Sequence, residues 1–169
     1  MRRVMKSLFI ALMVGAVGLA SAAAQDSTDT TNLVAGGSMG NVSSSSSFTS
    51  GANSTVNGYV NAAESITLGA NSVVTGNMSA GASVTTGASS KVRGSVHAKA
   101  SFTSGANSTV GGNVQAGANF TSGAFSVITG NVWVDGDVTL GAGSKILGSV
   151  HSGSGTITYG AGATVGSVK

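Results

Sequence analysis

The chain has 169 residues, enough for one domain with a sizeable core, and it contains 27 glycines but neither proline nor cysteine. Charged residues make up 8% of it and aromatic residues 5%, which excludes an ordinary mixed globular domain. Three of the eight basic residues lie at the N-terminus, and the five that follow Gln25 balance five acids. The remaining chain is therefore neutral, which indicates neither nucleic acid nor an acidic membrane as a partner.

The N-terminal segment has the pattern of a cleaved signal peptide. A basic stretch, 1–6, precedes an apolar stretch, 7–20, that is short for a membrane span, and three alanines, 22–24, follow. We predict a signal peptide over 1–24 and export to the periplasm, the cell surface or the medium. A retained N-terminal anchor is the alternative. Without cysteine, the exported protein has no disulfide and no lipid attachment through a thiol.

An eighteen-residue repeat organises the rest of the chain. Counted from Ser47 as column 1, six rows fit without a gap through Ser154, and a seventh from Thr156 fits with one residue inserted before it and one missing inside. We predict a Ser/Thr/Gly-rich tail over 25–39 and a repeat domain over 40–169. The sequence leaves open whether residues 25–46 join the first coil.

Even-numbered columns hold the large apolar residues, and odd columns hold mostly Ser, Thr, Asn and Gly. This alternation is typical of strands with one buried face. Column 2 contains Phe48, Ile66, Val84, Phe102, Phe120, Val138 and Ile157, column 10 runs from Val56 to Val165, and column 14 runs from Val60 to Val168. The pattern predicts an all-β fold, a single β-helix of about seven coils.

Columns 5 and 12 are glycine in every row. Glycine at a constant position predicts a corner, where the backbone turns with positive φ or neighbouring chains approach closely. Collagen is excluded because glycine does not recur every third residue. Amyloid built from imperfect repeats is the nearest competing interpretation, and the regular glycine corners favour a folded coil over it.

The repeat resembles that of the bactofilins, bacterial proteins that form polymers. The segments Val74-Thr75-Gly76-Asn77-Met78 and Ile128-Thr129-Gly130-Asn131-Val132 carry the resemblance, which extends over 40–169. It implies a right-handed β-helix that polymerises end to end without nucleotide. The columns themselves do not fix the handedness.

The last repeat suggests how such a polymer forms. Val165 and Val168 lie close to Lys169, so we expect this end of the solenoid to expose apolar residues and unpaired strand groups. We predict head-to-tail stacking of copies, with a structural role at the cell surface or outside the cell. A monomer protected by Lys169 and the serine-rich N-terminal segment is the alternative.

Column 3 is threonine in every row: Thr49, Thr67, Thr85, Thr103, Thr121, Thr139 and Thr158. A flat array of hydroxyl and methyl groups is similar to the threonine arrays of solenoid ice-binding proteins. Ice is therefore a candidate partner. The competing interpretation is that stacked threonines only stabilise the strands.

Trp133 and Phe125 are exposed aromatic candidates for contact with a glycan or a protein of the cell envelope, as in an adhesin. His97 and His151 stand three coils apart, too far to share a metal. No acidic pair and no nucleophile with a plausible base are present, so we predict no catalytic residues, no small-molecule substrate, no cofactor and no metal.

Overall fold

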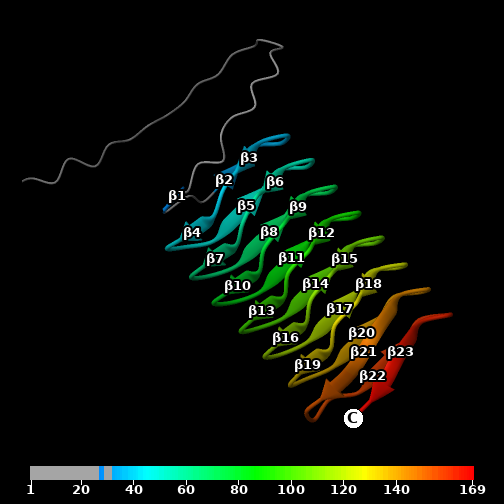
Figure 1. The fold of residues 1–169 in the computed structure, drawn as a ribbon. Helices are drawn as coiled ribbons and strands as arrows, with labels where there is room; N and C mark the ends of the chain where they lie inside the picture. The colour runs from blue at the N-terminus through cyan, green and yellow to red at the C-terminus, as the bar shows by residue number, and fades with distance from the viewer. Residues whose placement is uncertain (1–26, 29–31) are drawn as a thin grey trace, which may run out of the picture.

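The computed structural model describes residues 27–28 and 32–169, and all regular structure in this part of the chain is β-strand. The chain winds into a β-solenoid of about 8 turns with about 18 residues in each turn. Successive coils are displaced along one axis, from the blue coil near the N-terminus to the red coil at the C-terminus (Figure 1). The predicted all-β solenoid is confirmed, with one coil more than expected.

The strands form two sheets, an 8-stranded sheet and a 15-stranded sheet. The 8-stranded sheet takes columns 2 to 4 and contains, in order, β2 (Asn32–Leu33), β5 (Phe48–Ser50), β8 (Ile66–Leu68), β11 (Val84–Thr86), β14 (Phe102–Ser104), β17 (Phe120–Ser122), β20 (Val138–Leu140) and β22 (Ile157–Tyr159).

The 15-stranded sheet takes two segments from most coils. Columns 9 and 10 supply β3 (Ser38–Met39), β6 (Thr55–Val56), β9 (Val73–Val74), β12 (Lys91–Val92), β15 (Thr109–Val110) and β18 (Val127–Ile128). Columns 14 to 16 supply β4 (Val42–Ser44), β7 (Val60–Ala62), β10 (Met78–Ala80), β13 (Val96–Ala98), β16 (Val114–Ala116) and β19 (Val132–Val134), with β1 (Ser27–Thr28) before them. The long strand β21 (Lys145–Ser152) joins both sets of strands and pairs with β23 (Thr164–Val168).

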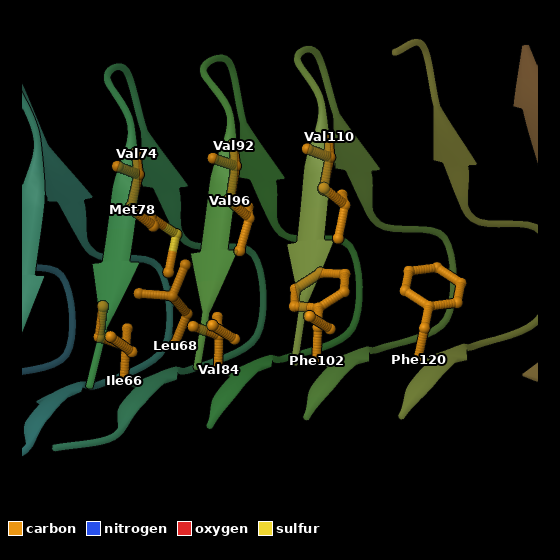
Figure 2. Close-up of a cluster of buried hydrophobic side chains, with 14 of the residues drawn as sticks. Ile66, Leu68, Val74, Met78, Val84, Val92, Val96, Phe102, Val110 and Phe120 are labelled. Carbon is orange, nitrogen blue, oxygen red and sulfur yellow. The ribbon is translucent and has the colours of Figure 1, made fainter. Parts of the chain in front are cut away.

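The core lies between the two sheets. Columns 2, 10 and 14 are buried in every coil from Phe48 to Val150, as the alternation predicts. Figure 2 shows these side chains filling the space between the strands, with Met78 pointing toward Leu68. The rings of Phe102 and Phe120 stack one coil apart, with centroids 5.6 Å from each other. Because each large apolar side chain adds about 1.5–3 kcal/mol on burial, this continuous column stabilises the rod.

Buried serines in column 8, from Ser54 to Ser144, bond to backbone carbonyls in the turns of six coils. The hydroxyl of Ser144 donates to the carbonyl of Gly141 at 2.7 Å, and that of Ser90 donates to the carbonyl of Gly69 in the preceding coil at 2.9 Å. Serine fits this buried position because its hydroxyl finds a backbone acceptor there.

The glycine columns are explained by close approach of neighbouring coils. A Cβ at Gly105 would lie 2.5 Å from the carbonyl carbon of Gly87, and one at Gly69 would lie 2.4 Å from that of Gly51. Positive φ occurs instead at column 7, which the sequence analysis did not single out. The residues there include Asn53, Asn71, Ser89, Asn107 and Phe125, with φ between 57° and 59°.

The coil stack begins before the predicted boundary at residue 40. Strand β2 pairs with β5, and β3 pairs with β6, so residues from Asn32 onward belong to the first coil and not to a tail. Strand β1 pairs with β4. The first coil escaped the repeat analysis because it is polar and one residue short. The predicted signal peptide, 1–24, lies outside the described residues.

Candidate binding surfaces

The threonines of column 3 form one unbroken ladder on the outward face of the 8-stranded sheet. Each lies beside the next in strand register, from Thr49 beside Thr67 to Thr139 beside Thr158. All seven side chains are exposed. Parallel strands place successive members about 4.8 Å apart. The structure thus brings together every residue of the predicted ladder.

The hydroxyls of this ladder make no hydrogen bond to another described residue, whereas several polar side chains of column 1 accept a backbone N–H of the next coil. The Ser101 hydroxyl accepts the backbone N–H of Asn119 at 3.3 Å, and the Asn119 side-chain oxygen accepts that of Asp137 at 2.9 Å. Column 1 therefore bridges several coils, and column 3 offers a continuous row of unengaged hydroxyls to solvent.

Asp137 continues the column 1 chain into the last coil. Its carboxylate accepts the backbone N–H of Thr156 at 2.8 Å and the hydroxyl of the same residue at 3.1 Å. These two bonds favour the ionised form, the backbone bond more strongly, and they lower the pKa of Asp137 below its ordinary value. The aspartate acts as a bridge between coils, like the serines and the asparagine before it.

Column 13 makes a second ladder of this kind, which the sequence analysis missed. The side-chain oxygens of Asn113 and Asn131 each accept the backbone N–H of the column 13 residue one coil later, both at 2.8 Å. Asn77 does the same for Ser95 at 2.9 Å. The recurrence of Asn and Ser in column 13 was the sequence signal that could have predicted these bonds between coils.

Column 15 lies on the outward face of the 15-stranded sheet, and it changes from coil to coil. His97, Gln115, Trp133 and His151 lie side by side along it. Trp133 is 43% exposed and, with Gln115, lines two open hollows of about 330 and 520 Å³. The first is lined by Asn77, Met78, Ser79, Ser95, Val96, His97, Asn113, Gln115 and Trp133, and the second by Gln115, Trp133, Val134, Asp135, His151 and Gly153.

Phe125 and Trp133 do not form a common site. Phe125 occupies column 7, in the turn between β17 and β18, where its ring lies over Gly143 of the next coil. It is 64% exposed but lines neither hollow beside Trp133. The two residues share a row of the repeat, yet the coil carries them to different parts of its circumference.

The last coil is more open than those before it. Val168 is 54% exposed and Tyr159 is 46% exposed, whereas Leu140 and Val150 of the preceding coil are buried. Val165 is partly buried against the core. The two residues predicted to take part in end stacking thus lie on the open side of β23.

The described residues hold no group of three or more His, Asp or Glu arranged for a metal ion. Within the same ranges, 27–28 and 32–169, no helix is long and apolar enough to cross a membrane. No family model, curated protein or solved structure matches the chain.

Proposed function

We propose that this protein is an exported, non-enzymatic structural module that assembles end to end, with the last coil of one copy pairing with the first coil of the next. A shared irregularity supports this best. Columns 10 and 14 are four residues apart in the regular coils but three apart at both ends, between Met39 and Val42 and between Val165 and Val168. The outermost described coils therefore have the same short form.

The two coils share further features. Each has glycine at the left-handed column 7 position, Gly36 with φ 70° and Gly162 with φ 69°, as the coil before the last also has at Gly143. Each also lacks the buried serine of column 8, which is replaced by Gly37 and Ala163. The turns at the two ends are thus alike in backbone form and small in side chain.

Stacking these coils would align them residue for residue. Thr158 would lie beside Asn32, Val165 beside Met39, and Val168 beside Val42. Within one copy, by contrast, β23 pairs with β21 across a register shift between Ile146 and Ser149. Two short coils have the same spacing, so the last coil of one copy can pair with the first coil of the next in continuous register, without such a shift.

Strand β1 occupies part of the surface that the second copy would take. Ser27 lies beside Val42, at a position that is apolar from Val42 to Val168. Val168 of another copy would continue this apolar column by pairing with the edge of β4 that β1 occupies. We therefore infer that assembly displaces β1, and that a chain beginning at Asn32 assembles at lower concentration than one beginning at Gln25.

Charge and resemblance agree with this role. The chain after Gln25 has equal numbers of basic and acidic residues, so little net repulsion opposes stacking. Bactofilins, which the repeat resembles, also polymerise end to end. With the predicted signal peptide, such a rod would form in the envelope or outside the cell.

Sedimentation velocity and negative-stain microscopy of residues 25–169 test the proposal. We expect species that grow with concentration, and short rods or filaments. Val168→Asp places a charge on the proposed contact and should keep the protein monomeric. Thr103→Asp introduces the same charged residue in the middle of the rod and should leave assembly unchanged. A monomer at every concentration would reject the assembly.

Ice binding is a second candidate, favoured specifically by the seven exposed and unengaged threonines in register. A rigid sheet holds their methyl and hydroxyl groups at a constant spacing, which suits a periodic surface. Thermal hysteresis of the purified protein is the measurement that decides it.

A further inference from the structure

The surface around Trp133 combines one flat aromatic side chain with several neutral hydrogen-bonding groups. Gln115 lies one coil before Trp133 and His151 one coil after it. A ring nitrogen of His97 lies 3.2 Å from the Gln115 side-chain oxygen. This contact steadies the amide beside the tryptophan, so one edge of the aromatic side chain borders an ordered polar row.

The hollows on either side give a ligand room to lie against the indole. Small residues line both hollows beside the larger side chains, Ser79 in the first and Gly153 in the second. Amide and imidazole groups both donate and accept hydrogen bonds, which suits neighbouring hydroxyl groups. The face of a neutral indole is electron-rich and attracts the weakly positive C–H hydrogens of a sugar ring.

Charge argues against nucleic acids and other phosphate-bearing ligands. Neither hollow is lined by lysine or arginine, and the second contains Asp135. Phosphate ligands need cationic contacts that are missing from this lining.

The surface is also a poor match for an apolar protein partner. Of the large exposed apolar residues in the described chain, only Trp133 lines these hollows. A stable protein interface buries about 800 Å² on each side around several apolar anchors. A single aromatic residue among polar groups fits a small hydroxyl-rich ligand better.

We propose that Trp133, Gln115 and His151, with His97 and Asp135 beside them, form a binding site for a neutral carbohydrate. The sugar ring stacks on the indole, and its hydroxyls bond to the amide, imidazole and carboxylate groups in the hollows. The site lies on the outward face of the rod and takes no residue from the first or the last coil, so it does not depend on the proposed assembly.

Trp133 is the only tryptophan, so its fluorescence reports on this site directly. We would titrate the full mature protein with cellohexaose and chitohexaose, measure the heat of binding in parallel, and test sedimentation with purified peptidoglycan. Binding of the free oligosaccharides would indicate a general glycan site. Sedimentation with peptidoglycan alone would identify the envelope as the source of the ligand.

Column 15 already contains a serine at Ser79, so Trp133→Ser should leave the fold intact. We expect it to weaken binding at least tenfold by calorimetry, and Gln115→Ala to weaken it less while the fluorescence signal remains. Phe125→Ala, which removes the other exposed aromatic of that coil, should leave binding unchanged. Absence of binding to all three probes, or equal affinity in Trp133→Ser, would overturn the proposal.

Discussion

The two outward faces of the rod are built on the same coils but differ in kind. Column 3 on the 8-stranded sheet is the same residue in all seven coils from Thr49 to Thr158, whereas column 15 on the 15-stranded sheet includes His97, Gln115 and Trp133 in successive coils. A constant column suits a partner that is itself periodic, and a varied column suits one discrete ligand. The solenoid can therefore carry two unrelated surfaces, provided that the interior holds both in register.

The largest expected effect comes from the interior that the two faces share. Gly105→Val would push a side chain into the backbone of Gly87, where even a Cβ lies 2.5 Å from the carbonyl carbon. Because backbone cannot yield as a side chain does, we expect a loss of about 3 kcal/mol or more of the free energy of unfolding. Thr103 lies two positions before Gly105 and is exposed, so Thr103→Val should change the free energy of unfolding by less than about 0.5 kcal/mol. Urea denaturation measures both, and similar losses would contradict close coil packing.

The next effect separates the faces. Thr103→Tyr interrupts the ladder in the middle of the rod, and if that face binds ice it should abolish thermal hysteresis while the fold is kept. Gln115→Tyr makes a comparable change on the other face and should leave hysteresis as it is. Hysteresis that survives Thr103→Tyr would mean that the ladder serves strand stability alone.

A smaller effect concerns the turn at column 7, which joins the two sheets. Phe125 and Asn107, which occupy this position in successive coils, both have a φ of 57°. Asparagine tolerates this left-handed conformation far better than phenylalanine does. Phe125→Asn should raise the free energy of unfolding by about 0.5–1 kcal/mol, because the relieved strain exceeds the lost contact with Gly143.

The reciprocal change is the control for that experiment. Asn107→Phe should lower the free energy of unfolding by a similar amount. If Phe125→Asn proved destabilising, the ring would contribute packing that outweighs its backbone strain.

The smallest effect is a pH dependence at the edge of the threonine face. The bonds from Thr156 lower the pKa of Asp137, so the stability they confer is present above the ordinary carboxyl pKa, 3.8, and is lost as the pH falls through the lowered value. Asp137→Asn keeps an acceptor, as Asn119 does one coil earlier, and should remove this part of the acid sensitivity. Melting temperatures between about pH 2 and 6 at low salt measure it. The same acid response in both proteins would contradict the assignment.

The interior was predictable because its signal repeats. Columns 2, 10 and 14 recur at a constant spacing, and their burial follows directly from strand alternation. The threonine ladder followed from the same count. The backbone conformation could not be predicted, because the left-handed residues at column 7 include three asparagines and a serine, which look like ordinary polar positions.

The first coil and the tryptophan site were missed for different reasons. Leu33 and Met39 are too few apolar residues to reveal strands in a polar segment that is also one residue short. Trp133 was predicted to act with Phe125 because they share a row, but its neighbours in space come from adjacent coils, as Gln115 does. A ligand site on a solenoid is assembled along a column, and row-by-row analysis overlooks it.

Pairing of the last coil with the first coil of another copy is tested most directly by disulfide trapping. The chain has no cysteine, so Asn32→Cys with Thr158→Cys introduces the only two thiols. Stacked copies would place them on adjacent parallel strands about 4.8 Å apart, within the range of a disulfide. We predict a ladder of covalent oligomers on non-reducing gels, and none for Asn32→Cys with Thr103→Cys. A purely monomeric Asn32→Cys, Thr158→Cys protein under oxidising conditions would contradict end-to-end assembly.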